Sequence, residues 1–191
     1  IGVELTEKEV GIICFGRVGK KVAELCKAFG AKVSAYDRYV AEQDFSKLNI
    51  SPLGLNEIFR TSDVITLHAP LTSETKYIIN RKTLDLMSEQ TLIINAARGS
   101  LINEQDLIEA LSQKKIGGAA LDVFQKEPLP KDSALKNLEN VIFAPHMGGY
   151  TEEAYSRASL EAAKKVIAYF KHQELSDRLP PDVSWFKNFE F

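Results

Sequence analysis

The sequence is poor in the features that mark several large classes of protein. It has only two cysteines, Cys14 and Cys26, and no framework of paired cysteines, so we interpret both as free thiols and expect a cytoplasmic location. The 24 basic and 26 acidic residues are interspersed and nearly balanced, which argues against a nucleic-acid footprint or a polybasic membrane patch. No apolar run approaches the roughly 20 residues of a membrane helix. We predict no nucleic-acid partner, no membrane partner and no metal site.

The 191 residues are enough for one ordinary domain with a full core. Short apolar runs alternate along the chain with helical patterns, which is typical of a parallel sheet covered by helices on both faces. We therefore predict an α/β, doubly wound, Rossmann-type domain. The predicted strands are 10–15, 32–36, 64–67, 91–95, 118–123 and 141–144, and the predicted helices are 18–29, 55–60, 82–87, 103–113 and 151–173.

The first predicted helix has an apolar face at helical spacing and ends before Gly30, which is a good helix stop. That face comprises Val18, Val22, Leu25, Cys26 and Phe29.

The chain after residue 173 differs from the rest. We assign residues 1–173 to one dinucleotide-binding domain and 174–191 to a tail in which Pro180 and Pro181 precede several aromatic rings. We interpret those rings as packing on the domain, in preference to a partner-binding motif.

A glycine-rich turn follows the first predicted strand and opens the first predicted helix. Cys14-Phe15-Gly16-Arg17-Val18-Gly19 matches the pattern G-x-G-x-x-G except that Cys14 replaces the first glycine. Asp37 lies at the end of the second strand, where a carboxylate can accept hydrogen bonds from the adenosine ribose and repel a 2′-phosphate. We predict NAD as the cofactor, although the neighbouring Arg38 could tolerate a phosphate.

Cys14 leaves three interpretations open. It can be a tolerated small residue, the cause of a weakened NAD site, or a redox-sensing thiol. A side chain at this position costs about 1 kcal/mol or more if the turn requires a positive φ.

Several ordered phrases of the sequence resemble the D-isomer-specific 2-hydroxyacid dehydrogenases, and most closely the phosphoglycerate dehydrogenase-like members. The resemblance extends over residues 2–170. It rests on GVELTEKEVGII, FGRVG, HAPLTSET, INAARGSLINEQDL, ALDVFQKEP and PHMGGYT.

The resemblance implies three catalytic residues. Arg98 would bind the substrate carboxylate and polarise the carbonyl, His146 would be the acid/base, and Glu127 would hydrogen-bond the histidine. The chemistry is coherent, because a guanidinium grips a carboxylate in a bidentate manner and the pKa of histidine lies near neutrality. Taken singly, each residue has a structural alternative. Arg98 could form a surface ion pair with a nearby acid, Glu127 could be a solvated loop carboxylate, and His146 could be a structural histidine.

The resemblance also implies a set of cofactor contacts, in which Asp122 would meet the nicotinamide carboxamide. We interpret His68 as a residue that positions its loop. The predicted cofactor-binding residues are Gly16, Arg17, Val18, Gly19, Asp37, Ala69, Pro70, Thr75, Ala96, Asp122 and Gly148.

The predicted function is hydride transfer between NAD(H) and a D-2-hydroxy acid or 2-keto acid, with an acid resembling 3-phosphoglycerate as one candidate substrate. Family members have a second domain, for which this chain has too few residues, so we expect the chain alone to bind NAD modestly and to be nearly inactive. The resemblance implies a homodimer through this domain. The alternative is an NAD-responsive, corepressor-like binding module without turnover. A third option is a degenerate structural subunit that binds no nucleotide.

Overall fold

A computed structural model of the chain describes residues 3–172. These residues belong to two compact units, of which the first ends at Pro145 and the second begins at His146. The predicted aromatic tail, 174–191, lies outside the described residues.

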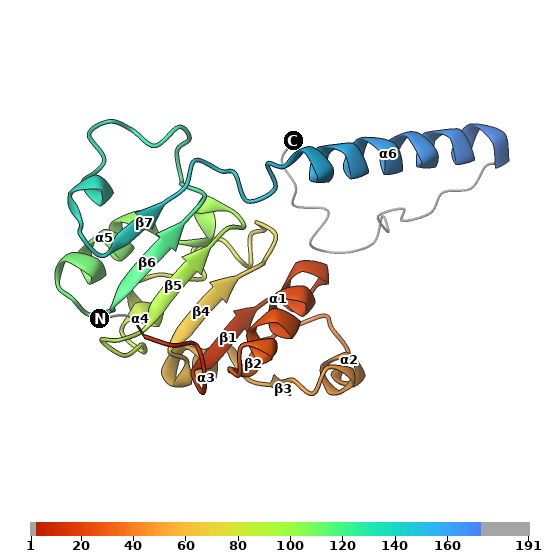
Figure 1. Cartoon of the computed structure of the whole chain (residues 1–191). Coiled ribbons are helices and arrows are strands. Elements are labelled where there is room, and N and C mark those ends of the chain that lie inside the picture. Colours follow the sequence, from red (N-terminus) through yellow and green to blue (C-terminus); the bar gives the residue numbers. More distant parts are fainter. Residues whose placement is uncertain (1–2, 173–191) are drawn as a thin grey trace. The chain divides into compact units, whose positions relative to one another are not determined.

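The first unit is built on a seven-stranded, fully parallel sheet (Figure 1). The order β3-β2-β1-β4-β5-β6-β7 reverses direction at β1, as in doubly wound folds. The predicted fold class is therefore confirmed. The strands are β1 (Glu9–Ile13), β2 (Lys32–Tyr36), β3 (Ser51–Pro52), β4 (Val64–Leu67), β5 (Leu92–Asn95), β6 (Gly118–Leu121) and β7 (Val141–Phe143).

The helices of the first unit connect these strands. They are α1 (Arg17–Ala28), α2 (Glu42–Lys47), α3 (Leu55–Thr61), α4 (Arg81–Leu84) and α5 (Glu104–Ser112), with 3-10 turns η1 (Gly99–Leu101) and η2 (Ala134–Asn137). The predicted strand 32–36 and strand 64–67 have the bounds that the structure gives them. The sequence analysis missed α2 and β3, because six and two residues are too short to display a periodicity.

Two helix starts follow from capping chemistry. The Asn103 side chain accepts a hydrogen bond from Asp106 N at 3.4 Å, as the predicted N-cap requires. Asn80 caps α4 in a capping box with Thr83. That cap starts α4 at Arg81, one residue before the predicted start, and the helix ends three residues before the predicted end.

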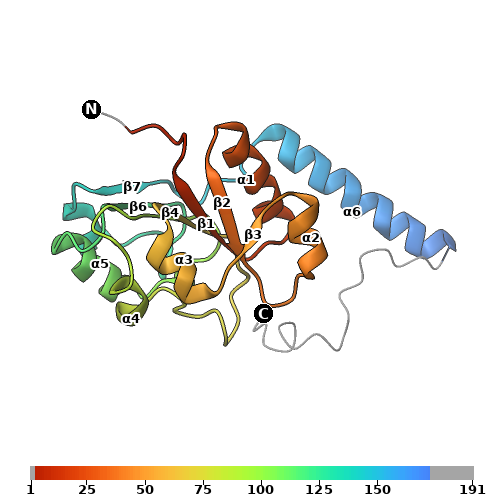
Figure 2. The ribbon, with the colours of Figure 1, turned by 90° about the horizontal axis from the view of Figure 1, so that it is seen from below.

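The two faces of the sheet carry separate apolar cores. Figure 2 shows α3, α4 and α5 together on one face, where Ile13, Ile65 and Ile93 are fully buried. Helices α1 and α2 cover the other face over β1 to β3, where Ile12 and Phe15 are fully buried. Alternate residues of β1 thus serve opposite cores.

The second half of the sheet is not covered equally on its two faces. In β5, Ile93 and Asn95 are buried, whereas Leu92 and Ile94 are 45% and 38% exposed. Ile142 of β7 is 73% exposed. The cause is topological: the right-handed crossovers from β4 to β6 all run in one direction and place their helices on one face. Within the first unit, this half of the sheet therefore has helices on one face only.

The core face of α1 also differs from the prediction. Gly19 and Ala23 are the buried residues, and the predicted Val22 and Cys26 are partly buried against the same core. The predicted Val18, Leu25 and Phe29 are instead more than half exposed. A Cβ atom on Gly19 would lie 2.4 Å from the carbonyl oxygen of Cys14. The small residues of α1 thus face β1, and the larger side chains of Val18, Leu25 and Phe29 point away from it toward solvent. Gly30 ends the helix with φ +79°, as predicted.

The second unit contains α6 (Glu152–His172), which has no buried residue. The Thr151 hydroxyl accepts a hydrogen bond from Ala154 N at 3.1 Å, so Thr151 caps the helix as predicted. Before it, Tyr150 N donates to Met147 O at 2.9 Å, and the Tyr150 and Tyr155 rings meet edge to face at 5.4 Å. Among the described residues, no helix has both the length and the apolar character needed to cross a membrane.

Candidate cofactor and active site

The carboxyl ends of the central strands meet at one edge of the sheet (Figure 1). The register aligns Ile13 with Tyr36 and with Leu67, and Leu67 with Asn95, which pairs with Leu121. The loops that follow these strands therefore start at one level. These loops, together with the first turn of α1, carry the predicted site residues of the first unit. The reversal of strand order at β1 lies among them. In open α/β sheets, ligands bind at such a position.

The turn after β1 has the geometry that a dinucleotide pyrophosphate needs. Cys14 has φ +71°, the left-handed conformation that favours glycine. Gly16 is the N-cap of α1, and a Cβ atom built on it would meet nothing within 4 Å. The first turn of α1 has no side-chain cap and no acidic residue. Its amides are therefore suited to a bound anion.

Asp37 supports this turn through its carboxylate. Oδ2 accepts a hydrogen bond from Phe15 N at 2.8 Å, and Oδ1 accepts from Tyr39 N at 2.8 Å and Val40 N at 3.2 Å. A carboxylate has about four acceptor positions, so Oδ2 retains capacity for a ribose hydroxyl. Asp37 thus fixes the end of β2 to the glycine-rich turn in addition to its predicted contact with the cofactor.

The thiol of Cys14 is poorly suited to redox chemistry. Burial, and secondly the Asp37 carboxylate, raise its pKa to about 12. Because the thiolate is the reactive form, this argues against the redox-sensing interpretation of Cys14. The positive φ leaves the tolerated residue and the weakened site as the two open interpretations.

The side-chain amide of the buried Asn95 fixes the backbone of the Arg98 loop. Asn95, only 1% exposed, donates from Nδ2 to Arg98 O at 2.9 Å and accepts at Oδ1 from Ala97 N at 3.1 Å. The exposed Arg98 side chain donates from Nη1 to Ala97 O at 2.6 Å. The guanidinium is therefore presented to solvent by a rigid backbone, with donors left for an anion.

The Glu127 loop packs directly on the Arg98 loop. A Cβ atom on Gly99 would lie 1.9 Å from Phe124 O and 2.6 Å from Gln125 N, so only glycine permits this contact. Glu127 Oε1 accepts a hydrogen bond from Phe124 N at 3.0 Å. The structure therefore brings the loops of Arg98 and Glu127 together at the ends of β5 and β6.

His146, the third predicted catalytic residue, opens the second unit. Its φ is +54°, in a region that residues other than glycine rarely adopt. Gly148, a predicted cofactor contact, belongs to the same unit. The roles of both residues stay predictions.

The loop after β4 is closed by hydrogen bonds of its own. The Thr75 hydroxyl donates to Pro70 O at 2.6 Å and accepts from Thr72 N at 2.8 Å, so Thr75 shapes the loop. His68 Nε2 lies 3.1 Å from the Thr66 hydroxyl, and burial lowers the pKa of His68. These contacts favour the interpretation of His68 as a residue that positions the loop. The cofactor contact predicted for Thr75 is untested.

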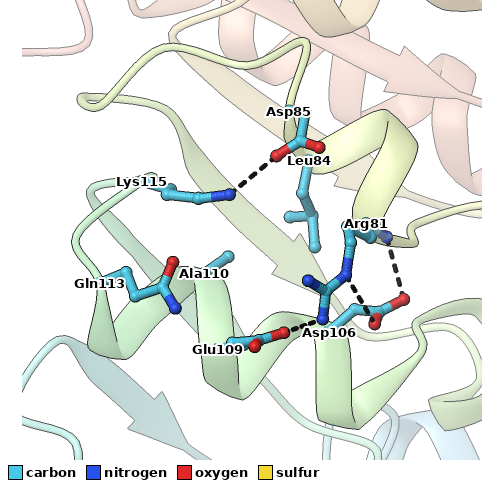
Figure 3. A pocket seen from close by; sticks show the side chains of 8 residues that line it. All are labelled: Arg81, Leu84, Asp85, Asp106, Glu109, Ala110, Gln113 and Lys115. Carbon is cyan, nitrogen blue, oxygen red and sulfur yellow. Dashed lines mark hydrogen bonds and ion pairs between the residues drawn. The ribbon is translucent and has the colours of Figure 1, made fainter.

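A second hollow, between α4 and α5, is distinct from this edge (Figure 3). Its charged lining residues pair with one another: Arg81 with Asp106 and Glu109, and Lys115 Nζ with Asp85 Oδ1 at 3.0 Å. None of the predicted site residues lines it. Within residues 3–172, no cluster of three His, Cys, Asp or Glu side chains could hold a metal ion.

Comparison with known proteins decides the family. The sequence model of the family "D-isomer specific 2-hydroxyacid dehydrogenase, NAD binding domain" matches residues 1–148, which is most of the chain. The chain belongs to this family. Its cofactor is NAD, and the glycine-rich turn described above fits a dinucleotide.

Individual dehydrogenases and reductases share this domain. The D-3-phosphoglycerate dehydrogenase of Methanocaldococcus jannaschii is 43% identical over 166 residues, 86% of this chain and 32% of the relative. A glyoxylate reductase from Paecilomyes thermophila has a TM-score of 0.89 at 28% identity, covering 96% of this chain and 55% of its own. The D-lactate dehydrogenase of Aquifex aeolicus, complexed with NAD and lactic acid, has a TM-score of 0.79 at 35% identity, covering 90% and 56%.

The chain thus spans from about a third to just over half of the proteins that it matches. The shared part is the 2-hydroxyacid dehydrogenase cofactor domain, and the substrates named for these proteins differ.

The sequence analysis missed the residues that hold the site together. Asn95 and Gly99 lie inside INAARGS, next to Arg98, yet their roles depend on contacts made across loops. Phe15 stacks on Phe45 of α2 with centroids 4.8 Å apart, which anchors the glycine-rich turn. An asparagine at the end of an apolar strand, three residues before a predicted catalytic cation, is the signal that could have identified Asn95.

Proposed function

We propose that the protein to which this chain belongs interconverts a D-2-hydroxy acid and a 2-keto acid. When bound, NAD supplies the hydride acceptor, and NADH the donor for the reverse direction. The substrates of the relatives, phosphoglycerate, glyoxylate and lactate, share a carboxylate beside the reacting carbon. A substrate resembling 3-phosphoglycerate is one candidate within this class.

We assign Arg98 to that carboxylate. Its guanidinium is exposed and held on a fixed loop, and a planar guanidinium can grip a carboxylate through two parallel hydrogen bonds. This grip would orient the reacting carbon, and the same positive charge would polarise its carbonyl oxygen.

We assign the proton transfer to His146 and a supporting role to Glu127. An imidazole exchanges a proton readily near neutral pH, and a nearby carboxylate favours its protonated form. The observation that carries the proposal is the packing of the Gly99 turn on Phe124, which places the Arg98 and Glu127 loops side by side.

The test is a steady-state assay of the full-length protein that contains this sequence, with NADH and a series of 2-keto acids as substrates. Replacing His146 by Gln should lower kcat/KM by about 10²–10⁴-fold. Replacing Arg98 by Gln should raise KM and lower kcat. Glu127→Gln should lower kcat/KM, because the supporting carboxylate proposed above is lost.

The matched controls are Arg60→Gln on α3 and His172→Gln at the end of α6, both exposed and outside the predicted site. They should retain the parental rate. Near-parental turnover by the His146 variant would overturn the assigned mechanism.

We further propose that residues 1–173 act as one cofactor domain together with a separate substrate domain, and that the protein is a cytoplasmic homodimer. The free thiols of Cys14 and Cys26 are compatible with that location. Nothing in the comparisons favours the corepressor-like alternative, since the proteins named above are dehydrogenases and reductases.

A further inference from the structure

Arg38 has the chemistry to bind a phosphate where a 2′-phosphate of NADP would lie. It directly follows Asp37, the carboxylate assigned to the adenosine ribose, at the end of β2. A guanidinium beside this position is a common way to accommodate NADP. The preference for NAD therefore depends on what the guanidinium contacts.

In the structure, Glu74 binds that guanidinium. Arg38 Nη1 lies 3.1 Å from Glu74 Oε2, and the Tyr39 hydroxyl donates to the same oxygen at 3.0 Å. Two residues that follow Asp37 thus share one acceptor from the loop after β4. The arginine is drawn toward that loop.

Glu74 is held in place by the closed turn around it. Lys76 N donates to Thr72 O at 2.9 Å, and Thr75 N donates to the Thr72 hydroxyl at 3.2 Å. The Thr75 hydroxyl ties the turn back to Pro70 O. The carboxylate therefore projects from a turn whose backbone is fixed at both ends.

We propose that Glu74 is a specificity-determining residue that disfavours NADP by pairing with Arg38, an inference that rests on the cofactor site assigned above. Asp37 and Glu74 carry two negative charges against the single positive charge of Arg38. A phosphate monoester adds about −1.5 to −2 at neutral pH. The approach of the phosphate is opposed by this net negative charge, and the neighbouring Arg38 guanidinium is already paired with Glu74.

The pair is exposed to solvent, which limits the size of the effect. The Arg38 and Glu74 side chains are 64% and 49% exposed. At this exposure we expect Glu74→Gln to strengthen NADP binding about two- to fivefold. NAD has no 2′-phosphate, so its affinity should stay the same. Salt screens exposed charges, so the NADP gain should shrink as ionic strength rises.

The experiment is calorimetric titration of the 191-residue chain with NAD and with NADP at low salt. The variants are Glu74→Gln, Arg38→Gln, the double variant, and Glu89→Gln as the matched control. Glu89 is exposed and lies with Gly117 and Asn140 at the amino ends of the strands, away from the cofactor edge. The double variant should lose the gain in NADP affinity, because the gain requires the freed guanidinium.

Three results would overturn the inference. One is an unchanged NADP affinity in Glu74→Gln when the wild-type chain binds NAD. Another is an equal gain in Glu89→Gln, which would make the effect one of net charge. If the wild-type chain fails to bind NAD, the cofactor assignment fails, and this inference fails with it.

Discussion

Replacing Gly99 by Ala tests the contact that joins the Arg98 and Glu127 loops. The new Cβ atom would lie 1.9 Å from Phe124 O and 2.0 Å from its carbonyl carbon. Both are backbone atoms, so one loop must move by about 1.5 Å to restore an ordinary contact. Overpacking of this kind costs about 1–3 kcal/mol. Reduced freedom of the unfolded chain returns about 0.4–1 kcal/mol of that cost.

We therefore expect Gly99→Ala to lower the free energy of unfolding by about 1–2 kcal/mol, measured by urea denaturation followed by circular dichroism. The melting temperature should fall by about 2–8 °C. The matched control is Gly54→Ala, where a Cβ atom meets nothing within 4 Å and φ is −66°. A loss below about 0.5 kcal/mol in Gly99→Ala, equal to that of the control, would refute the packing argument.

Three further predictions concern buried polar groups. With its pKa at about 12, Cys14 should resist alkylation by iodoacetamide at pH 8 in the folded chain and react fully after unfolding; rapid labelling of folded protein would contradict this. Asn95→Ala should cost about 1–3 kcal/mol in urea denaturation because it removes both hydrogen bonds to the Arg98 loop, and an unchanged midpoint would show that the amide does not hold the loop. Burial lowers the pKa of His68 below 6.5 in the folded chain. As the pH falls through 6.5, His68 is therefore protonated in the unfolded chain before it is protonated in the folded chain, and the free energy of unfolding decreases. His68→Gln should lose less stability between pH 7 and pH 5 than the parent does, and equal losses would argue against a titrating His68.

Local sequence signals were sufficient to predict every strand of the sheet except β3. Apolar runs such as 64–67, bounded by turns, predict strands because buried parallel strands must be apolar. The Asn103 cap and Gly30 predict helix ends because capping depends on the residue at that one position.

The signals failed where tertiary contacts override periodicity. Val18, Leu25 and Phe29 have the spacing of a core face, yet the close approach of Gly19 to Cys14 O selects the face with small residues. Leu92 and Ile94 are as apolar as their buried neighbour Ile93, so the sequence alone cannot reveal which side of β5 lacks a helix.

The site shows the same division. Arg98 and Glu127 are predicted from phrases that follow strands, and parallel strands bring such loops to one edge. The pairing of Arg38 with Glu74 joins residues 36 positions apart, and no local pattern encodes it.

The most direct test of the central claim is calorimetric titration of NAD into the chain and into its Gly16→Asp variant. A Cβ atom on Gly16 meets nothing, and aspartate is a good N-cap, so the variant should be as stable as the parent in urea denaturation. Its carboxylate would occupy the place of the pyrophosphate and repel it. The account predicts saturable one-to-one NAD binding by the parent and none by the variant. Equal NAD binding by both chains, or none by the parent, would contradict it.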